Sequence, residues 1–219
     1  MHKLAIPPEI IARVEARCGT AHPFNDLNPA RTAFVVIDMQ LGFMDPAINR
    51  LAGALRQAGG AVFWIQNTHD ASCDTSWSVM QRMATPAARA RRVAAMTEGS
   101  PGHALWPSLD VRPEDEKVLK RRFSAFIQGS SDLPARLRAR GFDTVLIGGT
   151  VTNVCCESSA RDAMMLDFRT IMVADANAAM NDAEHNASLA NFWNIFGDVM
   201  TVDHVIARLN AGAASEVAA

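Results

Sequence analysis

The apolar residues of this chain gather in short continuous runs that are separated by amphipathic segments. The clearest run, Thr-Ala-Phe-Val-Val-Ile-Asp, covers residues 32–38. A strand with apolar residues on both faces is typical of the interior of a parallel sheet, where both faces are covered. Further strands are expected at residues 61–67, 117–120, 144–148, 170–174 and 198–202.

Amphipathic segments with helix signals alternate with these strands. Asp45-Pro46 supplies a capping residue followed by proline at the first helical position, and Gly59-Gly60 ends that helix. Strands that alternate with helices predict an α/β fold with a doubly wound, mostly parallel sheet of about six strands and helices on both faces. The other helices are expected at about 7–18, 131–140, 153–166 and 182–195, with a last one after 202.

The chain shows no internal repeat and no linker, so residues 1–219 are expected to form a single domain. Residues 1–30 are interpreted as an N-terminal accessory segment, and residues 211–219 as a frayed tail. Residues 85–107 are interpreted as a loop that shapes a pocket.

Charge and composition limit the possible partners. With 21 Lys and Arg against 23 Asp and Glu, the net charge of −2 gives no broad attraction for nucleic acid or for an anionic membrane. A small-molecule substrate or another subunit is therefore expected. No apolar run approaches the roughly 20 residues of a membrane span, and the four cysteines are expected as free thiols, so a cytoplasmic location is predicted.

Three residues that can carry chemistry follow predicted strands, at the edge where parallel sheets bind ligands. Asp38 ends an apolar strand, where desolvation would make it a stronger base, and Lys120 could pair with it. Cys155 lies at the start of a predicted helix, where the helix dipole would favour a thiolate. The simpler interpretations are a helix cap for Asp38, a solvated basic run for Lys120 and a buried core thiol for Cys155.

Three segments together resemble the isochorismatase-like cysteine hydrolase superfamily: Val35–Phe43, Val118–Phe126 and Gly148–Ala163. The resemblance extends from about residue 32 to about residue 202. It implies that Asp38 is the catalytic base, Lys120 the accompanying lysine and Cys155 the nucleophile. The nucleophile in this pattern is the third residue after the threonine, which is Thr152 here, so the count selects Cys155 over Cys156.

The resemblance also implies a non-proline cis peptide at Thr150–Val151 and an oxyanion site made by the N–H groups of Val151 and Cys155. The implied reaction hydrolyses a small amide or ureido (N-carbamoyl) substrate through a thioester and releases ammonia, without a cofactor. The residues expected near the substrate are Thr150, Val151, Asn67, Gln40, Phe43 and Trp106.

The sequence leaves three other functions open. Relatives that hydrolyse the vinyl ether of isochorismate carry glycine at the position of Cys155. Nicotinamidase-like relatives carry a metal site with Asp-x-His after the second strand, whereas this chain reads Asn-Thr-His69-Asp, so no metal is expected. The third alternative is a non-catalytic binding subunit. The pair Gln66-Asn67 instead resembles the ureidoacrylate and N-carbamoyl amide branch.

Two further expectations concern a cluster of arginines and the assembly of the chain. The arginines at 82, 89, 91 and 92 could bind a substrate carboxylate, although such runs are more often solvated helix faces. The similar relatives commonly assemble, so the resemblance also implies a homodimer or homotetramer.

Overall fold

Six segments of the chain form one parallel sheet in the computed structural model, which describes residues 2–40 and 46–217. The strand order is β3-β2-β1-β4-β5-β6, and every neighbouring pair is parallel. The predicted fold class is therefore confirmed. The strands are β1 (Thr32–Ile37), β2 (Ala61–Asn67), β3 (Glu116–Lys120), β4 (Thr144–Thr150), β5 (Arg169–Ala178) and β6 (Asp198–Met200).

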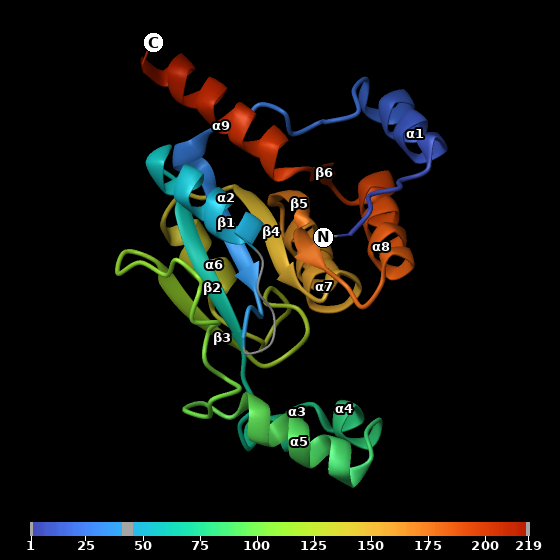
Figure 1. Cartoon of the computed structure of the whole chain (residues 1–219), viewed down its shortest axis with the longest axis vertical. Coiled ribbons are helices and arrows are strands. Elements are labelled where there is room, and N and C mark those ends of the chain that lie inside the picture. Colours follow the sequence, from blue (N-terminus) through green and yellow to red (C-terminus); the bar gives the residue numbers. More distant parts are fainter. Residues whose placement is uncertain (1, 41–45, 218–219) are drawn as a thin grey trace.

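Helices cover both faces of the sheet (Figure 1). The side chains of β1 alternate between two apolar cores, with Val35 and Ile37 in one core and Phe34 and Val36 in the other. One face is covered by α2 (Pro46–Gln57) and α9 (Val202–Val217). The opposite face is covered by α6 (Leu133–Ala139), α7 (Glu157–Met165) and α8 (Asp182–Ile195), and α1 (Pro8–Cys18) packs on α8.

Most predicted elements form within a few residues of their expected bounds. β5 extends four residues beyond the expected Ala174, because after an irregularity near Gly149 it pairs again with the end of β4. The last helix includes most of the segment that the sequence predicts to be frayed, since α9 ends at Val217. None of the helices in the described ranges is long and apolar enough to cross a membrane.

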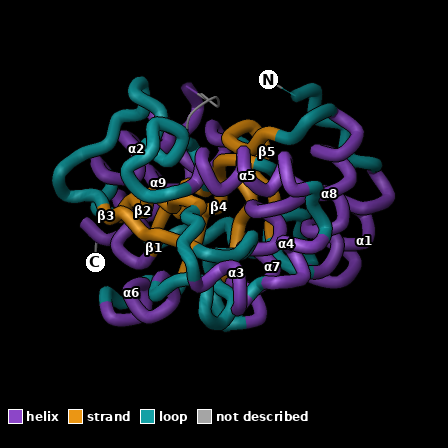
Figure 2. The backbone as a smooth tube through the Cα atoms, turned by 90° about the horizontal axis from the view of Figure 1, so that it is seen from below, coloured by secondary structure: helices purple, strands orange, loops and turns teal. Residues whose placement is uncertain are grey.

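The segment between β2 and β3 differs from the prediction. It contains three helices, α3 (Ser72–Ser76), α4 (Ser78–Arg82) and α5 (Pro86–Met96). The last of them, α5, lies where the sequence predicts the loop of residues 85–107. The sequence signal for α5 is its N-terminal cap. The Thr85 hydroxyl accepts a hydrogen bond from the N–H of Ala88 (3.2 Å), and Pro86 stands at the first helical position. We call residues 72–96 the arm; it projects from the edge where the strands end (Figures 1 and 2).

β1 and β4 approach each other closely at that edge. Gly149 has a φ of +120°, and a Cβ there would lie 2.0 Å from the carbonyl oxygen of Ile37, so only glycine fits. Asp38, directly after β1, has a φ of +51°, which is uncommon for a residue other than glycine. Its N–H donates to the carbonyl of Ile65 (3.0 Å), and its own carbonyl accepts from the Thr150 hydroxyl (3.0 Å). These contacts fix the position of the Asp38 carboxylate beyond the sheet.

Candidate active site

The carboxyl ends of three strands bring Asp38, Lys120 and Cys155 together. The Nζ atom of Lys120 lies 2.8 Å from Oδ2 of Asp38 and 3.5 Å from Sγ of Cys155. Lys120 is the last residue of β3 and Asp38 directly follows β1, whereas Cys155 lies five residues beyond β4. Parallel strands end at one edge of a sheet, so side chains far apart in the sequence meet there.

Lys120 is fully buried, yet each of its three ammonium protons has a partner. Besides Asp38 and Cys155, the ammonium donates to the carbonyl oxygen of Arg122 (3.0 Å). This set of partners excludes the interpretation of Lys120 as part of a solvated basic run. Burial alone would lower the pKa of Lys120, but Asp38 and Cys155 beside it raise that pKa overall.

The other two groups hold their protons more tightly than usual. Burial raises the pKa of Asp38, against the opposing effects of Lys120, Cys155 and the backbone of Asn67. Burial, assisted by the Asp38 carboxylate, raises the pKa of Cys155 to about 12 although Lys120 acts in the opposite direction. Cys155 is therefore a neutral thiol at pH 7, and it needs a base before it can act as a nucleophile.

The raised pKa of Cys155 differs from the thiolate that the sequence predicts, although the residue lies at the start of a helical segment, as expected. Cys155 lies in a π-helical turn, Thr152–Cys156, and α7 begins only at Glu157. The thiol thus lies in the first turn of this helical segment and contacts the Lys120 ammonium. Cys156, beside it, is fully buried in the core, and burial raises its pKa well above the ordinary value.

The backbone before Cys155 forms a cis peptide bond followed by a tight turn. The peptide bond Thr150–Val151 is cis, as the resemblance implies. The N–H groups of Val154 and Cys156 donate to the carbonyl of Val151 (3.0 and 3.3 Å), which closes the turn. Thr150 is also an expected substrate contact, but its hydroxyl donates to the carbonyl of Asp38.

Gln40 is also placed differently from the expected substrate contact. Its side chain is 3% exposed, and its Oε1 accepts from the N–H of Asn67 (2.8 Å). Its Nε2 donates to the carbonyls of Asn67 (3.2 Å) and His103 (3.0 Å). The Gln40 amide therefore continues the pairing of β1 with β2 beyond the last residue of β1, and it fixes the backbone of Asn67.

The remaining expected substrate contacts lie near the same edge, with one exception. The side-chain amide of Asn67 is half-buried and has no hydrogen-bond partner in the described part of the chain. The N–H of Trp106 donates to the carbonyl of Met39 (2.9 Å), and its buried indole Nε1 has no partner there either. Phe43 lies outside the described residues.

One histidine that supports this site gives no signal in the sequence. His185 of α8 is fully buried, and its Nδ1 lies 2.9 Å from the hydroxyl of Thr152 in the turn that carries Cys155. Burial lowers the pKa of His185 to about 4, so the ring is neutral at pH 7. The same turn is held by Ser188, which donates to the carbonyl of Thr152 (3.4 Å).

The residues considered as metal ligands or as carboxylate receptors show other contacts. His69 lies 3.7 Å from Asp74, and no group of three or more His, Cys, Asp or Glu in the described ranges could hold a metal ion. The absence of a metal in the enzyme stays a prediction. Arg89 pairs with Asp74 (2.7 Å), and Arg92 donates to Gln81 (2.5 Å), both within the arm.

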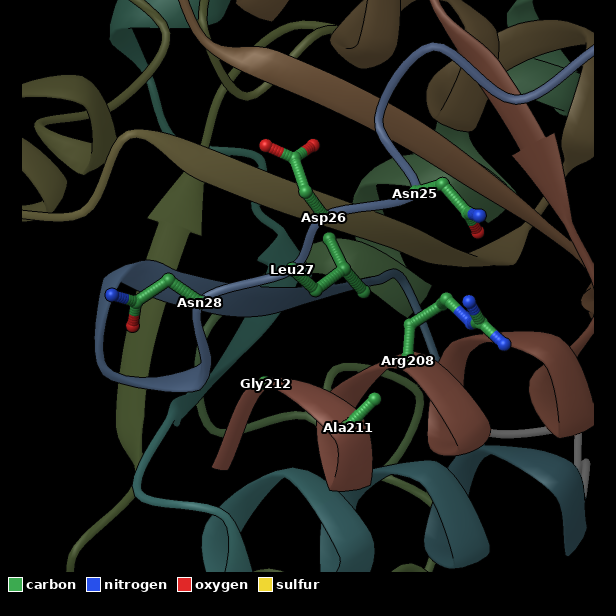
Figure 3. A pocket seen from close by; sticks show the side chains of 7 residues that line it. All are labelled: Asn25, Asp26, Leu27, Asn28, Arg208, Ala211 and Gly212. Atoms are coloured by element: carbon green, nitrogen blue, oxygen red, sulfur yellow. The ribbon is translucent and has the colours of Figure 1, made fainter. Parts of the chain in front are cut away.

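A hollow lies at the end of the sheet opposite Cys155, between residues 25–28, which precede β1, and helix α9 (Figure 3). Its charged residues are Asp26, which pairs with Arg169, and Arg208. The residues that line it include no thiol, hydroxyl or histidine. The hollow therefore lacks a nucleophile, and the chemistry belongs to the edge with Cys155.

Comparison with known proteins identifies the family of this chain. Residues 32–204 match the isochorismatase domain. The chain belongs to the isochorismatase family. This family is named for hydrolases, so the chain is an enzyme of the hydrolase class, as the sequence predicts.

The similar proteins cover most of this chain. It is 33% identical to the ureidoacrylate amidohydrolase RutB of Methylobacterium radiotolerans, over 80% of this chain and 78% of that protein. It is 32% identical to RutB of Rhizobium rhizogenes, over 87% and 88% of the two chains. A solved structure of a cysteine hydrolase from Pseudomonas syringae pv. phaseolicola matches with a TM-score of 0.75 and 29% identity, over 85% of this chain and 96% of that one.

The pKa directions of the three buried groups predict the pH dependence of kcat/KM. Activity should fall on the acid side as Asp38 becomes protonated, at a pH above the ordinary carboxyl value of 3.8, because its pKa is raised. It should stay level through the ordinary thiol value of 9.0, because the pKa of Cys155 is about 12 and that of Lys120 is raised. A rise of kcat/KM between about pH 7 and 9 would instead indicate a free thiolate nucleophile.

Proposed function

We propose that this hydrolase cleaves the carbon–nitrogen bond of a small linear amide or ureido acid, with Cys155 as the nucleophile. The observation that carries the proposal is that the Lys120 ammonium contacts both the Asp38 carboxylate (2.8 Å) and the Cys155 thiol (3.5 Å). A thiol, a base and a fixed positive charge together are the requirements of nucleophilic acyl transfer. The N–H groups of Val151 and Cys155, which the family resemblance implies as oxyanion donors, would supply the hydrogen bonds that a negative oxygen needs.

The first half of the reaction forms a thioester. The Oδ2 atom of Asp38 is paired with Lys120, and its Oδ1 has no hydrogen-bond partner within the described ranges, so a carboxylate oxygen remains to accept the thiol proton. The sulfur attacks the carbonyl carbon, and the two N–H groups stabilise the negative oxygen. The carbon–nitrogen bond then breaks, and Asp38 returns the proton to the leaving nitrogen, which departs as ammonia.

The second half regenerates the thiol. Asp38 takes a proton from water, and the resulting hydroxide attacks the thioester carbon. The carbon–sulfur bond breaks, a carboxylic or carbamic acid is released, and Asp38 returns the proton to Cys155. Lys120 stays protonated in both halves, because its raised pKa keeps the charge that stabilises Asp38. No cofactor or metal takes part in this proposed route.

The substrate class follows from the polar groups that remain free near the thiol. The side-chain amide of Asn67 and the indole N–H of Trp106 have no hydrogen-bond partner in the described part of the chain. A buried N–H without an acceptor is costly, so a polar substrate that accepts from it would bind favourably. A ureido or amide carbonyl offers this acceptor, and two similar proteins are ureidoacrylate amidohydrolases. We expect the enzyme to act in the cytoplasm.

The vinyl ether route is the second candidate. Its relatives carry glycine where this chain has Cys155, and the contact of that thiol with Lys120 favours the amide route. We therefore place the vinyl ether route behind amide hydrolysis.

A panel of substrates tests the proposal. Purified enzyme is incubated with linear ureido acids, simple amides, nicotinamide and isochorismate, and both ammonia and acid products are measured. We expect ammonia from the ureido acids or linear amides, at a kcat/KM at least about 100-fold above that for nicotinamide, because no metal is expected to orient a pyridine ring. Turnover of isochorismate without ammonia would contradict the proposal and favour the vinyl ether route.

A further inference from the structure

The turn that carries Cys155 is connected to helix α8 by polar contacts at its first residue. The hydroxyl of Thr152 lies 2.9 Å from Nδ1 of His185, and the Thr152 carbonyl accepts from the hydroxyl of Ser188 (3.4 Å). Ser188 also donates to the Glu157 carboxylate (2.6 Å), so its single proton is shared between two acceptors. The hydrogen bond with His185 is therefore the firmer of the two contacts that hold Thr152.

The position of Thr152 determines where the thiol lies. Thr152 directly follows Val151, whose carbonyl accepts from two N–H groups of the turn (3.0 and 3.3 Å) and so closes it. Cys155 belongs to this closed turn, and its thiol lies 3.5 Å from the ammonium of Lys120, which β3 positions separately. A shift of Thr152 would therefore move the thiol relative to Lys120. A misplacement of about 1 Å can lower a rate about 100-fold.

His185 is suited to fix Thr152 because its ring is polar and fully buried. A buried polar group that loses its hydrogen bond is costly, so the ring and the Thr152 hydroxyl hold each other in place. Burial lowers the pKa of His185 to about 4, and the ring is therefore neutral at pH 7. A neutral ring keeps one nitrogen as donor and one as acceptor, which suits a hydroxyl partner.

The N-terminal end of the chain lies beside α8 and covers the ring of His185 (Figures 1 and 2). The ring of His2 stacks on it, with centroids 4.4 Å apart and an angle of 20° between the planes. Nδ1 of His2 lies 2.7 Å from the Asp182 carboxylate, and its Nε2 accepts from the N–H of Ala179 (3.0 Å). Both ring nitrogens of His2 thus contact the start of α8, so the stacked ring has a defined position.

Two further contacts hold the N-terminal segment along the first turn of α8. The N–H of Ala5 donates to the side-chain oxygen of Asn186 (2.7 Å), and the Asn186 amide donates to the carbonyl of Lys3 (2.9 Å). Asn186 directly follows His185 in the chain. The N-terminal segment lies outside the matched isochorismatase domain, yet it packs on the helix that contacts the Cys155 turn.

We propose that His185 is a positioning residue of the reaction, which fixes the Cys155 turn through Thr152. His2 of the N-terminal segment holds the His185 ring in place. The proposal rests on the proposed role of Cys155 as the nucleophile. Neither histidine exchanges a proton with the substrate; the pair acts on the geometry of the thiol, so it affects kcat rather than substrate binding.

Substitutions of His185 that differ in hydrogen bonding test this role. His185→Asn keeps an amide near the position of Nδ1, whereas His185→Leu fills much of the space without a polar group. We expect His185→Leu to lower kcat about 10- to 100-fold with KM within about threefold of the wild type, and His185→Asn to recover most of the loss. Phe192→Leu, at another fully buried position of α8, controls for destabilisation and should keep the wild-type kcat.

A double-variant cycle assigns the effect to the contact with Thr152. Thr152→Val removes the hydroxyl and keeps the shape, so it measures the same contact even if His185→Leu fails to fold. Thr152→Val, His185→Leu and the double variant should have similar kcat values, because the second substitution breaks nothing further. Additive losses, or a wild-type kcat in Thr152→Val, would overturn the positioning role.

A substitution of His2 tests the N-terminal contact. His2→Ala should lower kcat about 3- to 10-fold without changing KM, because the His185 ring loses the ring stacked on it. Lys3→Ala is the control, since only the backbone carbonyl of Lys3 contacts α8. A His2→Ala protein with the wild-type kcat would overturn the role of the N-terminal segment.

Cys155→Ala in the same assay separates this proposal from the proposed function. If Cys155→Ala retains turnover, the nucleophile assignment fails and the positioning role fails with it. If Cys155→Ala is inactive while His185→Leu and Thr152→Val keep the wild-type kcat, only the positioning role is refuted.

Discussion

Replacing Cys155 by alanine should lower kcat on the true substrate by at least about 10,000-fold, because no other group can form the thioester. Cys155 is only 6% exposed and its thiol contacts Lys120, so the change removes a single buried sulfur atom. The fold and the KM of any residual activity should remain close to those of the wild type. Ammonia release measured over hours at high enzyme concentration gives the required sensitivity.

Cys156 provides the matched control for this experiment. It is the adjacent residue and is fully buried in the apolar core, and among the described residues it makes no hydrogen bond with the Lys120 ammonium. Cys156→Ala should lower the free energy of unfolding by about 1 kcal/mol and keep most of the activity, since a small apolar side chain is lost. If Cys155→Ala kept more than a few per cent of wild-type turnover, the thioester route would be untenable and the vinyl ether route would be favoured.

Replacing Lys120 by methionine should destabilise the protein and also slow the reaction. Methionine has a similar length but leaves the buried Asp38 carboxylate without its cation, and breaking a buried ion pair in this way costs about 3–5 kcal/mol. Denaturant unfolding measures the loss. Lys117→Met, an exposed position on the same strand, is the control and should change the free energy of unfolding by less than about 0.5 kcal/mol.

A double variant separates the two effects of Lys120. Asp38→Asn together with Lys120→Met removes both charges, so it should recover much of the stability that Lys120→Met loses. Its activity should stay at background, because an amide cannot accept the thiol proton. A Lys120→Met protein as stable as the wild type would show that the two buried charges do not compensate each other.

The sequence indicates the candidate site well because its three groups follow strands. Asp38 ends an apolar run, Lys120 ends a short predicted strand, and Cys155 follows the glycine-rich end of another strand, so a parallel sheet places all of them at one edge. The sequence could not indicate His185, because its contact with Thr152 joins segments 33 residues apart. The sequence predicts a loop where α5 forms for a different reason: a short alanine-rich helix without a packed face has weak hydrophobic periodicity.

By itself, the sequence determined the succession of the strands and of the helices that cover the sheet, and the residues at the strand ends, because both depend on local hydrophobic patterns and turn residues. Only the tertiary structure decided how these residues behave. Burial and the nearby Asp38 carboxylate raise the pKa of Cys155 to about 12, whereas its position in the sequence suggested an activated thiolate. Gln40 pairs with the backbone of Asn67 instead of facing a substrate. Such properties depend on distances and desolvation between distant segments, which a local pattern does not contain.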